Sequence, residues 1–486
     1  MTVLLSADVA SWDPCVVTST APATQSDLLS MVYGNLVWTD IRGVVQPGLA
    51  QGLTTADNIT WTLKLREGVK FIDGHAYDAD AVKYNWDRMA DPANSCTSQS
   101  WVATWDSSLT VTDPLTLTIK LPSADSSFGL KVAELIPYVT SPTALAAAAA
   151  KADIKPIGAG PFEETAWNPG VSSTYARNGS YWDSPRPYLD GVKVNIVTDA
   201  VARVSTVAQG GAQFMFGYPY QFGSSATATH VATYKVDVPG FNILWLNDKS
   251  GLMSDIRARQ AIWAAIDMNQ LVQALTTDPS VKAPTTYVPS TSPYYDPSLT
   301  FPTYDKAKAQ TLFDQLKAAG KSLNIKITAP NNSDTNRAAV YIQQVLDSYA
   351  GVTVSINSVT LSNWNDVTTN SHDFDIGVQP GILVYNSPEP NTYSFLRSGL
   401  SSNPGQYSST AMDADLAAAM SAVSDADKKA AYVNVQKQFL ADLPFVIFGL
   451  QNRYMLMRDN TCGIVNAGQG QLEYQYLYIA NFPGQC

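Results

Sequence analysis

Hydrophobic and polar residues alternate with a period of two in an early segment of the chain. Ile59, Trp61, Leu63 and Leu65 are separated by single polar residues. Because successive side chains of a strand point to opposite faces, this pattern places the four apolar residues on one side. It predicts an antiparallel strand with one face in solvent.

The pattern then changes to the period of a helix. Val82, Trp86 and Met89 recur at the spacing i, i+4 and i+7, which is typical of an amphipathic helix. Asp78 stands where an N-cap residue is expected, and Asp80 falls in the first turn, where a carboxylate favours the helix dipole. We interpret Trp86 as a core residue, with a ligand contact as the less favoured alternative.

Two further segments show helical spacing. The apolar positions in residues 25–40 predict a helix with Asp27 in its first turn. Residues 255–275 predict helical structure in which Arg257 and Arg259 point away from the buried face. Elsewhere helices and strands alternate along the chain. Together with the early antiparallel strand, this order indicates α/β domains joined by crossover connections.

Length and charge narrow the class of protein. The chain has 486 residues, which is enough for about two to four domains. Only 15% of the residues are charged, and the net charge is −11. Such a chain lacks the excess of Lys and Arg that neutralises phosphates. We therefore expect no nucleic-acid partner and no adhesion to anionic lipid.

The cysteines bear on the compartment. Cys15, Cys96, Cys462 and Cys486 lie far apart or near the chain end, and none belongs to a CxxC pair. This argues against a zinc site and against a thioredoxin-type redox site. An even number of cysteines in an exported protein favours disulfides, here Cys462–Cys486 around the C-terminal tail and Cys15–Cys96. The alternative is four buried free thiols.

The N-terminus leaves two interpretations. The chain opens with MTVLLSADVA, which has no basic segment followed by a long apolar one, whereas signal peptides have both. The protein is either cytosolic or the mature form of an exported protein with an added Met1. The cysteines and the low lysine content favour the second. No apolar window approaches the length of a transmembrane helix.

Motifs that mark common catalytic sites are absent from the sequence. His75, His230 and His372 are widely separated, and no HExxH, GxSxG or P-loop motif occurs. We therefore predict no catalytic residue, no metal and no cofactor, and hence a protein that is not an enzyme. A hydrolase that uses unmarked carboxylates is a remote alternative.

Aromatic residues make up 10% of the chain, and several lie in predicted loops. Tyr218 lies in GYPYQF, Trp364 in SNWND and Tyr385 in LVYNSPEPNTYSFL. Loop aromatics suit a ligand cleft, because rings cover a large area at a low entropy cost. The alternative is a set of small cores beneath the loops.

An ordered set of motifs resembles the bacterial extracellular solute-binding proteins of the peptide/nickel ABC-importer family, family 5. The segment GVKFIDGHAYDADAVKYNWDRM is similar to that family's pattern around a short strand, a turn and a helix. It is followed in the expected order by PIGAGPFEETAW, RNGSYWD, LWLND, DIRARQAIWAAID, YSSTAMDADLAAA and LPFVIF. The likeness runs from about residue 5 to about residue 450.

The resemblance implies a large periplasmic-binding-protein type II-like fold, with two α/β lobes around a cleft plus an extra domain. It places lobe I in residues 1–40, 155–242 and 450–486, extra domain II in residues 41–154, and lobe III in residues 243–449. The lobes would close on a ligand by a hinge motion. The implied function is the substrate-binding component of an ABC importer, which delivers a small-molecule or peptide ligand to a permease in the cytoplasmic membrane.

The resemblance also bears on the class of ligand. Peptide-binding members of the family hold the free amino terminus with a carboxylate just before a Tyr-Asn-x-Pro stretch. Here Tyr385 and Asn386 begin that stretch, and Val384 precedes it. Glu389 and Asp13 are the candidate substitutes. An unpaired ammonium in a closed cleft would cost several kcal/mol, so a glycan fragment or an aromatic or amphipathic metabolite is the alternative to a peptide.

Further ligand contacts follow from the same likeness. Trp364 lies where the family places a cleft tryptophan, and we predict ligand contacts for it and for Tyr385, Asn386, Tyr218 and Trp245. Nickel would need a cluster of ligands that the sequence does not show. We expect a monomer outside the cytoplasm, in the periplasm or at the cell surface, with a lipid anchor where a removed N-terminal segment supplied one.

Overall fold

The chain forms two compact units in the structure, which is a computed structural model. It describes residues 1–9, 11–16, 23–148, 154–218, 230–276, 279–383, 391–467 and 472–481. Unit 1 consists of Met1–Val236 and Arg453–Cys486, and unit 2 of Asp237–Asn452. The chain passes from unit 1 to unit 2 within strand β12 (Val231–Leu246) and returns within strand β16 (Phe445–Arg458).

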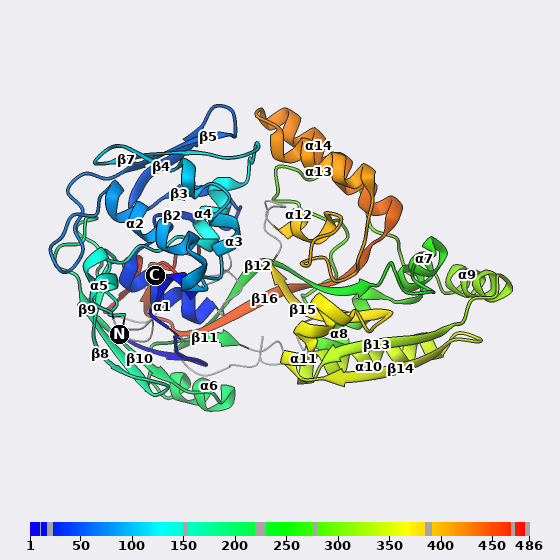
Figure 1. The fold of residues 1–486 in the computed structure, drawn as a ribbon. Helices are drawn as coiled ribbons and strands as arrows, with labels where there is room; N and C mark the ends of the chain where they lie inside the picture. Colours follow the sequence, from blue (N-terminus) through cyan, green and yellow to red (C-terminus); the bar gives the residue numbers. More distant parts are fainter. Residues whose placement is uncertain are drawn as a thin grey trace. The chain divides into compact units, whose positions relative to one another are not determined.

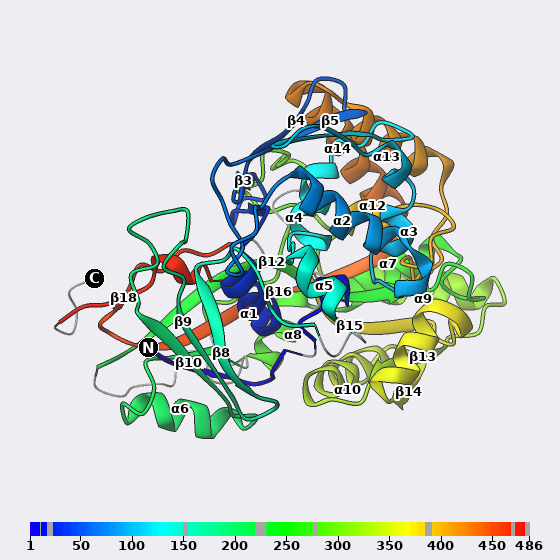
Figure 2. The same cartoon turned by 60° about the vertical axis from the view of Figure 1, so that its left-hand side comes forward.

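The first sheet of unit 1 begins at the N-terminus (Figures 1 and 2). Its strands lie in the order β16, β11, β1, β10, β9 and β8, with β16 contributing its residues from Arg453 onward. Strand β1 is parallel to both β10 and β11, and β11 is antiparallel to β16. Leu4 of β1 packs with Val207 of helix α6 in one apolar cluster. The bounds are β1 Thr2–Leu5, β8 Phe162–Asn168, β9 Ser172–Arg177, β10 Gly191–Ile196, β11 Phe214–Tyr218, α1 Ala23–Tyr33 and α6 Ala200–Ala208.

The second sheet of unit 1 is antiparallel, with the order β4, β5, β7 and β6. Helix α2 packs on β6 and β7. The bounds are β4 Ala50–Thr55, β5 Thr60–Leu65, β6 Thr110–Asp113, β7 Thr116–Lys120, α2 Ala79–Ala90, α3 Gln99–Val102, α4 Phe128–Leu135 and α5 Pro142–Ala147. Unit 1 also contains two short two-stranded antiparallel sheets, β2 Val37–Thr39 with β3 Val45–Pro47 and β17 Thr461–Cys462 with β18 Tyr478–Ile479.

The two early sequence predictions concern strand β5 of this second sheet and helix α2, and both are confirmed. Trp61, Leu63 and Leu65 of β5 are buried. Val82, Trp86 and Met89 of α2 are buried in the same core. The Asp78 carboxylate caps α2 by accepting from the backbone N–H of Ala81 at 2.9 Å, and Asp80 lies in the first turn. The interpretation of Trp86 as a core residue also holds.

Unit 2 has a sheet with the order β14, β13, β15 and β12. Strand β13 is parallel to β14 and β15, whereas β12 is antiparallel to β15. A large apolar core includes Trp245, Trp263 and Phe439. The bounds are β13 Asn324–Pro330, β14 Thr353–Val359, β15 Ile376–Leu383, α7 Ile256–Ala265, α8 Met268–Leu275, α9 Lys306–Ala318, α10 Ser333–Asp347, α11 Leu361–Asp366, α12 Asn391–Leu396, α13 Thr410–Ser421 and α14 Asp425–Asp442.

Two sequence predictions about helices are wrong. Helix α1 begins at Ala23, so Asp27 lies beyond its first turn; Asp27 is fully buried and accepts from the backbone N–H of Leu472 at 3.0 Å. Arg259 is only 7% exposed, because the Asp248 carboxylate accepts from it at 2.5 Å and the Met253 carbonyl at 2.7 Å. Leu472 lies 445 positions from Asp27, and the Asp442 carbonyl, which accepts from Arg259 at 2.8 Å, lies 183 positions away, so a local period cannot indicate these partners.

A disulfide joins two segments of unit 1. Cys15 and Cys96 are bridged, with their Cα atoms 4.8 Å apart, as the sequence predicts. Cys462 is also disulfide-bonded, and its predicted partner Cys486 lies outside the described residues. The backbone N–H of Thr97 also donates to the carbonyl oxygen of Cys15 at 3.0 Å. The bridge therefore ties the segment after β1 to the segment after α2.

The α/β class predicted from the sequence is confirmed in both units, while the division into three domains stays a prediction.

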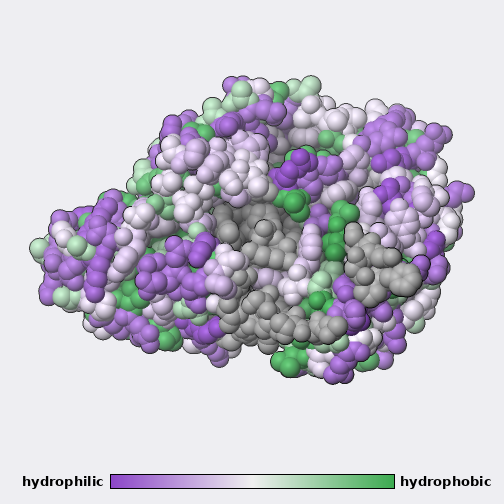
Figure 3. Space-filling view, turned by 180° about the vertical axis from the view of Figure 1, so that it is seen from behind, coloured by the Kyte–Doolittle hydropathy of each residue, from purple (hydrophilic) through white to green (hydrophobic). Residues whose placement is uncertain are grey.

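The face seen in Figure 3 carries mainly hydrophilic residues, and its coloured hydrophobic residues form small separate groups. No helix in the described part of the chain is both long enough and apolar enough to cross a lipid bilayer.

Replacing both bridged cysteines in a Cys15→Ser/Cys96→Ser variant should destabilise unit 1. The bridge spans a sequence separation of 81 residues, and it restricts the unfolded chain. We expect a loss of about 2–4 kcal/mol in the free energy of unfolding. Urea unfolding followed by circular dichroism and fluorescence would measure it, with one transition allowed for each unit. The unit 2 transition is the internal control, and an unchanged unit 1 midpoint would contradict the prediction.

Candidate functional site

A buried ion pair fixes the loop that follows strand β1. Asp13 is fully buried, and its two carboxylate oxygens accept from the Arg88 guanidinium at 2.8 Å and 2.7 Å. The same carboxylate accepts from the backbone N–H of Cys15 at 2.9 Å. Arg88 belongs to α2, so this pair joins the loop to that helix. The charge of Asp13 is thus balanced within unit 1, and its ligand contact stays a prediction that these contacts do not support.

A group of polar side chains lies against the same loop. The Asp8 carboxylate accepts from the indole N–H of Trp167 at 2.9 Å and from the backbone N–H of Gly170 at 2.8 Å. The Trp12 ring packs edge-on against Trp167, with 6.1 Å between the ring centroids. Burial, together with the negative charge of Asp8, raises the pKa of Glu164 to about 7. A buried oxygen of Glu164 has no hydrogen-bond partner among the described residues.

Two of the predicted ligand residues are core residues of unit 2. Trp245 is 1% exposed; its indole N–H donates to Gln379 at 2.5 Å, and its ring meets Phe445 edge-on at 5.1 Å. Trp364 is 3% exposed and packs over Gly377, where a Cβ atom would lie 3.0 Å from the tryptophan ring. Their contacts are those of packed side chains, and their roles toward a ligand stay predictions.

The remaining predicted ligand residues are only partly described. Tyr218 is the last residue of β11, and it pairs in register with Tyr454. Tyr385, Asn386 and Glu389 lie outside the described residues. The structure therefore does not bring the predicted residues together in one described site.

A cavity in unit 1 is built around the end of helix α1. Gly34 adopts φ +69° and ends the helix, as a glycine with a left-handed backbone commonly does. Gly160 lies so close to the last turn that a Cβ atom would stand 2.5 Å from the Met31 carbonyl oxygen. The side-chain amide of Asn178 donates to the Gly160 carbonyl at 2.8 Å. The Gly-rich segment thereby positions the RNGSYWD segment beside the helix end.

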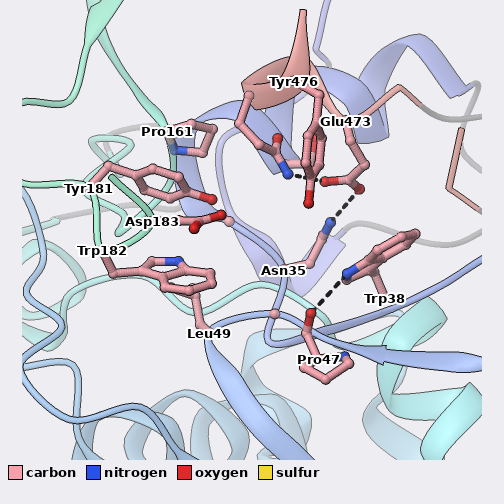
Figure 4. A pocket seen from close by; sticks show the side chains of 14 residues that line it. Asn35, Trp38, Pro47, Leu49, Pro161, Tyr181, Trp182, Asp183, Glu473 and Tyr476 are labelled. Carbon is pink, nitrogen blue, oxygen red and sulfur yellow. Dashed lines mark hydrogen bonds between the residues drawn. The ribbon is translucent and has the colours of Figure 1, made fainter. Parts of the chain in front are cut away.

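The cavity encloses about 50 Å³ and is lined by polar and aromatic side chains. Figure 4 shows the rings of Tyr181 and Trp182 on one side and that of Trp38 on the other. The Trp38 indole N–H donates to the Pro47 carbonyl at 3.0 Å. The lining residues are Ser30, Gly34, Asn35, Trp38, Pro47, Gly48, Leu49, Pro161, Tyr181, Trp182, Asp183, Glu473, Gln475 and Tyr476.

Glu473 is the most deeply buried acid of this cavity. Its side chain accepts from the side-chain amide of Gln475 at 2.5 Å and from that of Asn35 at 3.3 Å. Burial raises the pKa of Glu473, and these two amide hydrogen bonds act in the opposite direction. No ion pair among the described residues involves Glu473, whereas Asp183 pairs with Arg186 at 2.6 Å.

Unit 2 contains a second cavity, of about 460 Å³. It lies at the junction of α7 and α8, where the Trp263 ring packs on Phe301 with 5.0 Å between centroids. The Asp267 side chain caps α8 and accepts from the backbone N–H groups of Asn269 and Gln270. Its lining residues are Trp263, Ile266, Asp267, Met268, Asn269, Ala283, Pro284, Thr285, Thr300, Phe301, Pro302, Thr303 and Tyr304.

The described residues that line these two cavities include no histidine and no cysteine. In the described part of the chain, no three His, Cys, Asp or Glu side chains are arranged to hold a metal ion. What the unit 1 cavity offers is hydrogen bonding, carboxylate charge and aromatic surface, which are the means of binding.

Sequence reasoning missed the unit 1 cavity. Asn35 and Glu473 meet across a separation of 438 residues, and no local period connects them. The RNGSYWD motif supplies Tyr181, Trp182 and Asp183, so a weak signal was present in the sequence. The EYQY stretch, residues 473–476, carried a similar one.

A family model and a relative of similar sequence both match this chain. The family model described as "Bacterial extracellular solute-binding proteins, family 5 Middle" matches residues 44–403. The glutathione-binding protein GsiB of Salmonella paratyphi A is 26% identical over 458 residues, which cover 88% of this chain and 86% of that protein.

Two solved structures share the fold. The substrate-binding protein CtaP of Listeria monocytogenes superposes with a TM-score of 0.85 at 19% identity, with 99% of both chains covered. The oligopeptide-binding protein AppA of Bacillus subtilis, solved in complex with a nonapeptide, gives a TM-score of 0.80 at 21% identity, again with 99% of both chains covered. The predicted periplasmic-binding-protein type II-like fold is confirmed by this likeness.

An Asp13→Asn variant should strongly destabilise unit 1. The substitution leaves the guanidinium of Arg88, whose side chain is 17% exposed, without its carboxylate partner. Removing one partner of a buried pair costs about 3–5 kcal/mol. Chemical denaturation would measure the loss. The matched control is Asp190→Asn, which removes a fully exposed carboxylate paired with Arg177; equal stability of the two variants would contradict the buried pair's role.

A Glu164→Gln variant should flatten the pH dependence of stability. The pKa of Glu164 is about 7 in the folded chain, against an ordinary value of 4.5. Between these values the folded chain holds a proton that the unfolded chain releases, so stability falls as the pH rises through this window. Above it the variant should exceed the parent by about 1–2 kcal/mol, a range reduced for solvent screening. Denaturation curves from pH 4 to 8 test this, since the two proteins should be nearly equal at pH 4.

Proposed function

Because the chain belongs to the bacterial extracellular solute-binding proteins of family 5, we propose that it captures a peptide or peptide-like solute for an ABC importer. In this role the protein releases the solute to a permease in the cytoplasmic membrane and catalyses no reaction. The single observation that carries the proposal is the family match over residues 44–403. The fold shared with CtaP over 99% of both chains supports it.

Support for a peptide-like solute comes from the relatives. GsiB is named a glutathione-binding protein, and AppA was solved with a nonapeptide. We transfer to this chain only the class of solute. The solute would lie between lobe I, residues 1–40, 155–242 and 450–486, and lobe III, residues 243–449, with residues 41–154 as an extra domain.

The contacts that we propose for the solute come from the predicted loop residues. Tyr385 and Asn386 would offer a ring and an amide, and Glu389 would supply the carboxylate for an amino terminus. Tyr218 would contribute from the end of β11. Trp364 and Trp245 are nearly fully buried, and we assign them a supporting role beneath that surface.

A non-peptide solute is the second candidate. Val384 stands where peptide-binding members of the family carry the carboxylate that holds the amino terminus. A solute without an ammonium group would have no need of that carboxylate, and stacking and neutral hydrogen bonds would hold it. The low content of charged residues, 15%, suits such a ligand.

The same family membership supports a place outside the cytoplasm, in the periplasm or at the cell surface. A lipid on a preceding segment would keep the protein near its permease. The net charge of −11 supports the absence of a nucleic-acid partner, and we propose a monomer as the working form.

Freshly purified protein should release its solute on denaturation. Mass spectrometry of the released fraction, against a boiled buffer control, would identify it. A series of short peptides, or a glutathione-like thiol peptide, would support peptide import, whereas a single non-peptide compound would select the second candidate. The identified solute should then bind with 1:1 stoichiometry by calorimetry and be recovered intact. Turnover of the solute would overturn the proposal.

The same calorimetric assay can locate the site. A Tyr385→Ala variant should lower the affinity by about 1–3 kcal/mol if the ring stacks on the solute. The matched control is Tyr84→Ala, a tyrosine of α2 that is 44% exposed. Equal affinities for the two variants would remove Tyr385 from the proposed site and leave the class of protein intact.

A further inference from the structure

The unit 1 cavity has aromatic walls around a small space. Trp38, Tyr181, Trp182 and Tyr476 all line it, and Figure 4 shows their rings distributed around its centre. The faces of aromatic rings carry negative potential, so a set of rings around one space attracts a cation. None of the four rings is fully buried. The cavity is therefore open to a small solute from the surface of unit 1.

The carboxylates of the cavity strengthen this preference. Glu473 is 5% exposed, and its two oxygens are met by neutral amides and by no cation among the described ion pairs. Asp183 is balanced by Arg186, whose guanidinium also lies 4.5 Å from the centre of the Tyr476 ring. The charge of Asp183 is thus neutralised by Arg186, whereas the carboxylate of Glu473 can interact with a cation that enters the cavity.

One ring of the cavity already contacts a cation that belongs to the protein itself. The guanidinium of Arg66 lies 3.9 Å from the centre of the Trp182 ring and donates to the Gly48 carbonyl at 2.7 Å. This cation fixes the orientation of Trp182. The Trp182 ring is therefore held in place before any ligand binds, which lowers the ordering cost of binding.

We propose that this cavity is a second binding site, which takes the ammonium group of a small organic cation. Its aromatic rings hold the cation by their faces, and the carboxylate of Glu473 supplies the opposite charge. A volume of about 50 Å³ accommodates a primary ammonium head and excludes a whole peptide. All of the described lining residues belong to unit 1.

The chemistry of the lining distinguishes this cation from other small ligands. A metal ion prefers a shell of several oxygen, nitrogen or sulfur ligands with close geometry, whereas the charged groups of this lining are two carboxylates, of which Asp183 is already paired with Arg186. An anion would meet the carboxylates of Glu473 and Asp183. An ammonium group uses both the rings and the charge.

The inference does not rest on the proposed function. Trp364, Trp245 and Tyr218, the described residues proposed for the imported solute, are not among the residues that line this cavity. The importer solute and the ammonium compound are therefore expected to bind independently. Failure of one leaves the other standing.

The test uses calorimetry on the full chain with methylammonium chloride and with tetramethylammonium chloride. Sodium, potassium and calcium chloride at matched ionic strength are the ion controls. We expect saturable 1:1 binding of methylammonium, with quenching of tryptophan fluorescence. Tetramethylammonium, which is larger than the cavity of about 50 Å³, should bind more weakly. No saturation up to about 100 mM, or equal binding of potassium or calcium, would overturn the proposal.

Two variants assign the binding to this cavity. Glu473→Gln keeps the shape and removes the charge, and Trp182→Leu removes a ring from the wall; each should weaken binding by about tenfold or more. Asp190→Asn, an exposed carboxylate of unit 1 outside the cavity, should bind as the parent does. Where Glu473→Gln fails to fold, Trp182→Leu decides the question alone. Parent-like affinity in the folded variants would place the binding elsewhere and refute the assignment.

Discussion

The buried pair of Asp13 and Arg88 is the interaction on which the organisation of unit 1 depends. The pair connects the loop after β1, a strand of the first sheet, to helix α2, which packs on the second. Two charges taken out of water are favourable only when their geometry is close and further hydrogen bonds complete it. The disulfide of Cys15, two residues after Asp13, holds the same connection covalently. The hydroxyl of Tyr33, at the end of helix α1, donates to the carbonyl of Trp12 in this loop, so the helix end beside the cavity is linked to the same connection.

Much of the local structure could be predicted from the sequence. A period of two identified β5 and a period of 3.6 identified α2, because each pattern reports which face is buried without reference to a partner. The ordered motifs allowed the family to be predicted, because their residues form turns, caps and packing contacts. The glycine before Pro161 is an example: any Cβ atom there would meet the backbone of α1. The Asp78 cap succeeded because a cap is made with residues three positions away.

Features made by distant partners could not be predicted in the same way. Asp27 looked like a residue of a first turn, and it is instead a buried acceptor for Leu472, 445 positions away in sequence. Arg259 looked like a surface residue, and its guanidinium instead pairs with Asp248 and donates to the carbonyl of Asp442, 183 positions away. The cavity residues Asn35 and Glu473 belong to the same category. In each case the side chain is polar, so it is buried only where a hydrogen-bonding or charged partner lies beside it in the fold. The sequence alone does not show which residue that partner is.

Three buried or half-buried acids in unit 1 show how differently a carboxylate can be accommodated in a chain with few charges. Asp13 has an arginine, so its charge is neutralised in place. Glu164 has no cationic partner among the described ion pairs but faces Asp8, and its pKa rises to about 7, so near neutral pH it holds a proton for part of the time. Among the described residues, Glu473 accepts from two side-chain amides beside a cavity lined in part by aromatic rings. A buried carboxylate needs a cation, a proton or strong donors. Asp13 has its cation, and Glu164 takes a proton. Glu473 lies beside a space in which a cation fits. We therefore interpret Asp13 and Glu164 as structural acids and Glu473 as a binding one.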